Sequence, residues 1–99
     1  MKVIVVIPTY NEADNVRLLI PWILGLGDVY HVLVVDDNSP DGTSGVVEEM
    51  MRQDKRVAIL KRPGKLGLGS AYIAGFKKAL SMGADLIMEM DADHSHDYK

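Results

Sequence analysis

Four short apolar runs alternate along the chain with longer segments in which apolar residues recur at helical spacing. The runs cover residues 3–7, 32–35, 57–60 and 86–90. The first two are rich in β-branched residues and apolar on both faces, as in parallel strands that helices cover on either side. The alternation predicts an α/β chain of the order β-α-β-α-β-α-β, with right-handed crossovers and an open, Rossmann-like parallel sheet.

The segments between the runs carry helix start signals. Asn11 is expected to cap the first helix, whose initial N–H groups stay unpaired, and Pro21 is expected to kink or restart that helix. The second helix is expected to begin near Ser39 and Pro40. The third is expected to begin around residues 69–70 and to turn inward Tyr72, Ile73, Phe76 and Leu80.

Size and composition limit the classes of protein that fit. A chain of 99 residues is one domain at most, and its net charge of −3 gives no basic stripe for nucleic acid. The absence of Cys excludes disulfides, thiolate catalysis and zinc–thiolate sites, and it fits a reducing, cytoplasmic compartment. No apolar run approaches the ~18 residues of a membrane span, and the run before Pro8 is too short for a signal peptide.

Two pairs of acids follow apolar runs. Asp91 and Asp93 come directly after the fourth run, and Asp36 and Asp37 follow the second. A lone D-x-D is more often two solvated loop acids. Two pairs at the carboxyl ends of parallel strands instead favour one electronegative crevice, where open α/β sheets bind ligands. Mg²⁺ suits such a place because it uses one or two carboxylates together with substrate phosphates.

The first two loops offer groups that suit a nucleoside. In V-I-P-T-Y-N-E at 6–12, Tyr10 can stack on a base and Glu12 can accept a hydrogen bond, although the stretch also reads as an ordinary helix start. In D-D-N-S-P-D-G-T at 36–43, turn and cap duty accounts for Asn38, Ser39 and Asp41. Asp37 is the exception, and a sugar hydroxyl or a base amine is the partner we expect for it.

The last two motifs are less specific. K-R-P-G-K-L-G-L-G-S-A-Y at 61–72 suits a phosphate, but it lacks both the Rossmann and the P-loop spacing and equally fits a solvated surface loop. His94 and His96 are expected to orient neighbours or to lie in a loop rather than to bind metal, and His31 is expected to be exposed. Glu89 lies within an apolar run and needs a partner that the sequence does not name.

These stretches, in this order and spacing, resemble glycosyltransferases of the GT-A type, family 2, and within it the polyprenol (dolichol) phosphate mannosyltransferases. The resemblance rests on P-T-Y-N-E, D-D-N-S-P-D-G-T, K-L-G-L-G-S-A-Y and M-D-A-D-H-S-H, with Tyr98 standing where that family commonly has Pro. It implies an inverting, metal-dependent enzyme that transfers mannose from GDP-mannose to a polyprenyl (dolichyl) phosphate. The β-α alternation, with a ligand crevice that needs the strand order to reverse between the first and fourth strands, predicts the sheet order 3-2-1-4. The resemblance makes this sheet the N-terminal half of a GT-A fold.

The resemblance also assigns site residues. The guanosine side of GDP-mannose would be held by Pro8, Tyr10, Glu12, Val35 and Asp37. The diphosphate would be met by Asp91, Ala92 and Asp93, with Asp91 and Asp93 carrying Mg²⁺ or Mn²⁺. No general base is assigned, because the acceptor phosphate is already an anion near neutral pH.

Members of that family continue beyond the D-x-D loop. We therefore expect residues 1–99 to be the nucleotide-sugar-binding part of a truncated domain, with little transfer activity alone. A non-catalytic nucleotide-sugar-binding module is one alternative. A receiver-like signalling domain is a remote one, because in receivers the acid pair ends the first strand. The fourth strand is an apolar edge, so a homodimer through it or its covering is expected, as is peripheral contact at the cytoplasmic face of a membrane.

Overall fold

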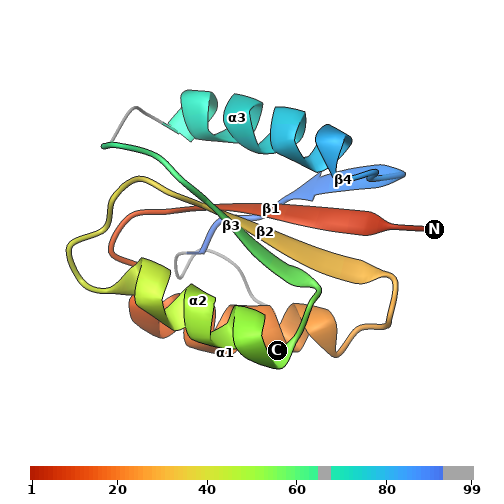
Figure 1. The fold of residues 1–99 in the computed structure, drawn as a ribbon, viewed down its shortest axis with the longest axis horizontal. Coiled ribbons are helices and arrows are strands. Elements are labelled where there is room, and N and C mark those ends of the chain that lie inside the picture. Colours follow the sequence, from red (N-terminus) through yellow and green to blue (C-terminus); the bar gives the residue numbers. More distant parts are fainter. Residues whose placement is uncertain (65–67, 93–99) are drawn as a thin grey trace.

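The computed structural model describes residues 1–64 and 68–92. Four strands form one parallel sheet in the order β3-β2-β1-β4, which confirms the predicted fold class and strand order. Helices α1 and α2 cover one face of the sheet and α3 covers the other (Figure 1). The elements are β1 (Val3–Thr9), α1 (Ala13–Leu24), β2 (Tyr30–Asp36), α2 (Thr43–Gln53), β3 (Val57–Lys61), α3 (Leu68–Ser81) and β4 (Leu86–Glu89).

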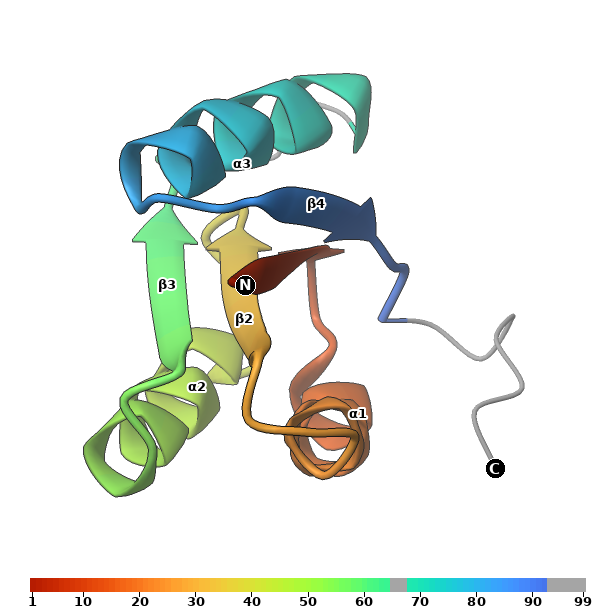
Figure 2. The same ribbon diagram turned by 90° about the vertical axis from the view of Figure 1, so that its right-hand side faces the viewer.

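The order of the strands reverses at β1. The chain proceeds from β1 to β2 and β3 on one side, and α3 then returns it to the other side of β1, where β4 lies at the edge (Figure 2). Open α/β sheets bind ligands at such a reversal, outside the carboxyl ends of the strands. The order also excludes a receiver domain, because the receiver order 2-1-3-4-5 places the first strand beside the third.

Each face of the sheet has its own apolar core. The face covered by α1 and α2 buries the larger cluster, which is built from Val5, Ile7, Val16, Leu19, Ile20, Ile23, Val32, Val34, Val47, Val57 and Ala92. The face under α3 buries Ile4, Val6, Leu33, Val35, Ala71 and Ala79. Because both faces of β1 and β2 are covered, their sequences are apolar at successive positions rather than at alternate ones.

The most buried residues of α3 on the side of the sheet are small, although Tyr72 also packs against the core there. The predicted inner face is wrong for Ile73 and Leu80, which are 58% and 64% exposed. Ala71 and Ala79 are buried instead, one helical turn on either side of Gly75. A Cβ on Gly75 would meet Val6 Cγ1 at 2.3 Å, so α3 lies too close to β1 for a larger side chain there.

The sequence predicts that Asn11 caps the first helix, and this prediction is wrong. Asn11 has a φ of +58°, and Glu12 occupies the cap position without a side-chain cap bond. The N–H groups of residues 11–13 donate instead to Ser39 Oγ (2.9 Å), Thr43 Oγ1 (3.1 Å) and Asp41 Oδ2 (3.2 Å). The prediction of unpaired N–H groups is therefore wrong for residues 11–13, and the β1–α1 and β2–α2 loops are bound to each other.

The second helix starts later than predicted. It begins at Thr43 rather than near Ser39 and Pro40, after Gly42 adopts a φ of +84°. Asp41 Oδ1 accepts hydrogen bonds from the Thr43 N–H, at 3.0 Å, and from the Thr43 hydroxyl. One carboxylate therefore caps the starts of both α1 and α2. Helix α1 is assigned as one helix through Pro21, which does not restart it.

The structure also bears on the predicted apolar edge strand and on the predicted absence of a membrane span. Leu86 and Met88 of β4 are 50% and 42% exposed, as expected of an apolar edge. Dimerisation through this edge stays a prediction. In the part of the chain that the structure describes, no helix has the length and apolar character needed to cross a bilayer.

We expect Gly75→Ala to lower the free energy of unfolding by about 1–3 kcal/mol, the usual range for overpacking. The loss should appear even though alanine favours a helix by roughly 1 kcal/mol over glycine. Gly45→Ala in α2 is the control, because a Cβ there meets nothing within 4 Å. Urea denaturation should show Gly45→Ala slightly stabilised; equal effects from the two substitutions would contradict the close approach of α3.

Asp41→Ala should destabilise the protein by about 0.5–2 kcal/mol near neutral pH, as loss of a helix cap does. Slight burial acts to raise the pKa of Asp41, but hydrogen bonds from Thr43 and from the Ala13 N–H outweigh it and hold the pKa below its ordinary 3.8. The contribution of the ionised carboxylate is therefore present above pH 3.8 and is lost as the pH falls through the lowered value.

Chemical denaturation at several pH values measures this difference. The gap between wild type and Asp41→Ala should narrow in acid, whereas Asp28→Ala, at an exposed acid between α1 and β2, should show no such cap-related gap. A gap that stayed constant down to pH 2 would show that the ionised carboxylate is not what caps the helices.

Candidate functional site

The carboxyl ends of the strands bring the two acid stretches to one edge of the sheet. Thr9 and Asp36 are register partners, and the Asp37 N–H donates to the Thr9 carbonyl at 3.1 Å. On the other side of β1, the Met90 N–H donates to the Val6 carbonyl at 3.1 Å, which places Asp91 beyond the end of β4. The predicted grouping of Asp36, Asp37 and Asp91 at one edge is thus present.

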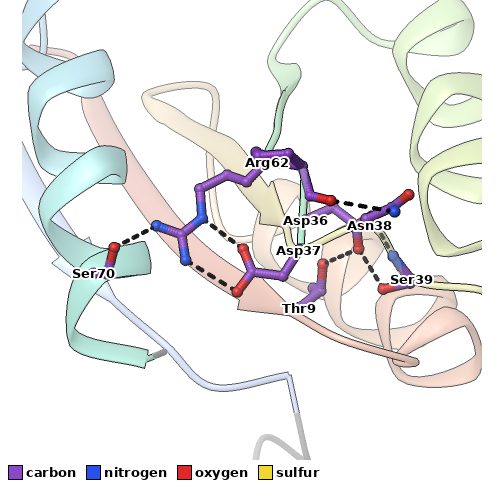
Figure 3. A network of polar contacts seen from close by, with 8 residues as sticks. Thr9, Asp36, Asp37, Asn38, Ser39, Arg62 and Ser70 are labelled. Carbon is purple, nitrogen blue, oxygen red and sulfur yellow. Dashed lines mark hydrogen bonds and ion pairs between the residues drawn. The ribbon is translucent and has the colours of Figure 1, made fainter. Parts of the chain in front are cut away.

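Asp36 is a structural residue. It is 1% exposed, and its Oδ1 accepts hydrogen bonds from Thr9 Oγ1 (2.8 Å) and Ser39 Oγ (2.6 Å). Its Oδ2 accepts from the Ser39 N–H at 3.0 Å (Figure 3). Asn38 donates from Nδ2 to the Pro63 carbonyl at 3.4 Å. The loop role predicted for Ser39 is confirmed, that of Asn38 stays a prediction, and Asp36 fastens the β2–α2 loop to β1.

Asp37 has a protein partner that the sequence reasoning missed. Arg62 holds it in a two-pronged ion pair, with Nε to Oδ1 at 2.6 Å and Nη2 to Oδ2 at 3.0 Å, and each side chain is 8% exposed. Arg62 Nη1 also donates to Ser70 Oγ at 2.8 Å (Figure 3). A carboxylate has about four acceptor positions, so this pairing still leaves Asp37 capacity to accept from a ligand.

A signal for this pair was present in the sequence. Asp36 and Lys61 are register partners at the ends of adjacent parallel strands, so the residues that follow them, Asp37 and Arg62, are neighbours. The sequence reasoning expected the cations of residues 61–72 either to approach a phosphate or to be solvated in a surface loop, and it did not pair Arg62 with an acid. The signal was that Asp37 and Arg62 each come directly after the last residue of two strands that pair in parallel.

Asp91, the first acid of the predicted metal pair, is half-buried. The Tyr72 hydroxyl donates to its Oδ1 at 2.7 Å. Asp93, His94 and His96 lie outside the described residues, so the predicted pair is described at Asp91 only. Among residues 1–64 and 68–92, no three His, Asp or Glu side chains are grouped to hold a metal. Carboxylate oxygen is nevertheless the donor type that Mg²⁺ and Mn²⁺ prefer, and Asp91 fits them in that respect.

The two polar residues predicted on the first loop lie near this edge. Tyr10 is 37% exposed, so part of its ring is open to a base. Glu12 is half-buried, and its Oε2 accepts from Asn15 Nδ2 at 2.8 Å. The Asp37 N–H donates to the carbonyl of Thr9, the residue before Tyr10, so Tyr10 lies close to the end of β2 that is followed by Asp37.

The apolar residues predicted for the site form its support. Pro8 and Val35 are register partners on β1 and β2. The Val35 side chain is fully buried in the core under α3, and Ala92 is 3% exposed in the core on the opposite face. These side chains shape the edge from beneath, and only the backbone of Val35 is left to touch a ligand.

Glu89 and His31 lie outside this network of hydrogen bonds. Glu89, for which the sequence names no partner, is exposed, so its carboxylate does not need a buried partner. His31 is half-buried rather than exposed, at the opposite end of β2. Burial, followed by repulsion from Lys2 and Arg56, lowers the pKa of His31 from its ordinary value.

Arg62→Met should destabilise the protein by about 3–5 kcal/mol, because it leaves the Asp37 carboxylate buried without its cation. The double variant Asp37→Asn with Arg62→Met should recover part of that loss, since no buried charge remains. Arg17→Met is the control: its ion pair with Asp14 is exposed, and its loss should cost less than about 1 kcal/mol. Urea titrations measure all three, and a small effect of Arg62→Met would contradict the buried pair.

Comparison with known proteins identifies a family that matches this chain. A family model described as Glycosyl transferase family 2 matches residues 4–99. The polyprenol monophosphomannose synthase of Mycolicibacterium smegmatis is 45% identical over 96 residues, which make up 96% of this chain and 36% of that protein. The undecaprenyl-phosphate mannosyltransferase of Micrococcus luteus is 46% identical over 96 residues, 97% of this chain and 40% of that protein.

A solved structure shows the same fold. The mannosyltransferase PcManGT from Pyrobaculum calidifontis, in complex with GDP-Man and Mn²⁺, superposes with a TM-score of 0.71 at 25% identity. The match covers 93% of this chain and 27% of that one, so the chain spans well under half the length of each protein compared here. The family match runs over nearly all of the sequence, and the sheet has the predicted strand order. This chain belongs to glycosyl transferase family 2.

Proposed function

We propose that this chain forms the donor side of an enzyme that transfers mannose from GDP-mannose to a polyprenyl phosphate. The observation that carries the proposal is the shared edge of the sheet at which two acids lie on either side of β1: Asp37, held by Arg62, follows β2, and Asp91, held by Tyr72, follows β4. The names of the two relatives support the sugar and the lipid acceptor. The complex of PcManGT with GDP-Man and Mn²⁺ supports the donor and the metal.

The guanosine would bind at the ends of β1 and β2. Tyr10 offers a partly exposed ring, and stacking of a base on an aromatic side chain contributes about 1–3 kcal/mol. Glu12 and Asp37 offer carboxylate acceptors for N–H and O–H donors, and the ion pair with Arg62 fixes the direction in which Asp37 accepts. Pro8 and Val35 support this end through the β1–β2 pairing.

The diphosphate would bind at the end of β4, beside Ala92. Asp91 and Asp93 would hold Mg²⁺ or Mn²⁺ there. When bound, the metal neutralises the charge that develops on the departing GDP diphosphate. The protein's own residues would hold the Asp91 carboxylate in one orientation here, through the hydrogen bond from the Tyr72 hydroxyl.

The acceptor requires little from a general base. A polyprenyl phosphate is already an anion near neutral pH, and it can attack the sugar without first losing a proton. We therefore assign no catalytic base among these residues, and direct attack agrees with inversion at the sugar carbon. Because the acceptor carries a long apolar chain, the reaction would take place at a membrane surface, in line with the expected peripheral contact.

GDP should bind this protein only when Mg²⁺ or Mn²⁺ is present, because the acids at the end of β4 otherwise repel the diphosphate. Isothermal calorimetry should show binding with Mn²⁺, its loss in EDTA, and its loss in Asp91→Ala. Asp28→Ala is the matched control, because it removes an exposed acid between α1 and β2, at the opposite edge of the sheet. GDP binding of equal strength without metal would show that the acid pair is not a metal site.

A second nucleotide tests the base preference, and a separate transfer assay tests the reaction. UDP should bind more weakly than GDP, and equal affinity would remove the guanosine assignment. Incubation with radiolabelled GDP-mannose and polyprenyl phosphate tests the whole reaction by the label found in the lipid phase. Little transfer is expected of residues 1–99 alone and fits both the proposed donor side and a nucleotide-sugar-binding module, whereas clear transfer would exclude the module.

A further inference from the structure

The Tyr72 hydroxyl needs an explanation beyond packing. The ring is half-buried and lies against the core under α3, where a phenylalanine would fill the same space. The hydroxyl donates to Asp91 Oδ1 at 2.7 Å, across 19 residues of sequence. Packing therefore accounts for the ring, and the contact with Asp91 accounts for the oxygen.

The main chain around Asp91 is held on both sides. The Met90 N–H donates to the Val6 carbonyl at 3.1 Å, and Ala92 is 3% exposed within the core against α1. With the backbone fixed before and after Asp91, the main freedom left to this residue is the rotation of its side chain. The bond from Tyr72 acts on that freedom.

The helix that carries Tyr72 is equally well fixed. Gly75 lets α3 approach Val6, and Val6 is the same residue whose carbonyl holds Met90. One turn earlier, Ser70 accepts a hydrogen bond from Arg62, the partner of Asp37. The start of α3 therefore reaches both acid stretches, through Ser70 on one side and Tyr72 on the other.

We propose that Tyr72 is a positioning residue that orients the Asp91 carboxylate for a divalent cation. The inference rests on the proposed function, because it requires a metal at Asp91. A phenol hydroxyl suits this task, since it directs a carboxylate without cancelling the charge that attracts the cation. Hydrogen-bond partners of metal ligands are commonly needed in this way, and their loss lowers metal affinity or activity about 10–100-fold.

The test measures binding of Mn²⁺ in the presence of GDP, by the electron paramagnetic resonance signal of the free ion relative to a Mn²⁺–GDP mixture without protein, in four proteins: wild type, Tyr72→Phe, Tyr30→Phe and Asp91→Ala. Tyr72→Phe should raise the Kd for Mn²⁺ about 10–100-fold while its thermal unfolding stays close to that of wild type. Tyr30→Phe removes a hydroxyl at the start of β2, at the opposite edge of the sheet, and should change neither quantity. Asp91→Ala should abolish binding.

The outcomes separate the two proposals. If wild type fails to bind Mn²⁺, or Asp91→Ala binds it as well as wild type does, the metal site of the proposed function is wrong and this inference falls with it. If Asp91→Ala loses binding but Tyr72→Phe keeps full affinity, the hydroxyl is a structural contact and only this inference is overturned. A Tyr72→Phe chain that does not fold would likewise assign the bond to stability and overturn the positioning role.

Discussion

Carboxylates that gather at one edge of the sheet impose the constraint on which the rest of this structure depends. Asp36 and Asp37 are almost fully buried, and a buried charge is tolerated only when it is paired or well hydrogen-bonded. Hydroxyl and N–H donors from β1 and the β2–α2 loop satisfy Asp36, and a guanidinium that follows β3 satisfies Asp37. Satisfying these acids therefore fastens together the ends of three strands and the loops that leave them.

A carboxylate also joins the starts of two helices, here from an exposed side chain. Asp41 accepts hydrogen bonds from the starts of both α1 and α2, so the β1–α1 and β2–α2 loops cannot move independently. Tyr10 lies just before the N–H groups that the second loop holds, and its position is fixed by contacts that involve no ligand. A site built this way is arranged before its ligand arrives, which lowers the entropy lost on binding.

Sequence reasoning predicted the strands and their order, because apolar runs and right-handed crossovers depend on local pattern and general topology. It failed where a contact joins distant residues. The cap expected from Asn11 is supplied by residues about 30 positions later. The inner face of α3 was assigned to Ile73 and Leu80 because hydrophobicity ranks them above glycine and alanine, whereas close approach to β1 selects small residues. The spacing Ala71, Gly75 and Ala79, four residues apart, was the available signal.

Asp37, after β2, is paired with a cation, whereas Asp91, after β4, accepts a hydrogen bond from a neutral hydroxyl. This difference would suit a ligand with a neutral part and a charged part. Asp37 is paired with a guanidinium, so its charge is neutralised within the protein and it can meet a neutral base without a large desolvation penalty. Asp91 is half-buried and accepts from a phenol hydroxyl, which sets its direction while its negative charge persists. A diphosphate would be repelled by such a charge unless a cation lay between them. Since α3 holds Arg62 through Ser70 and Asp91 through Tyr72, one rigid helix fixes the spacing between the neutralised end and the charged end.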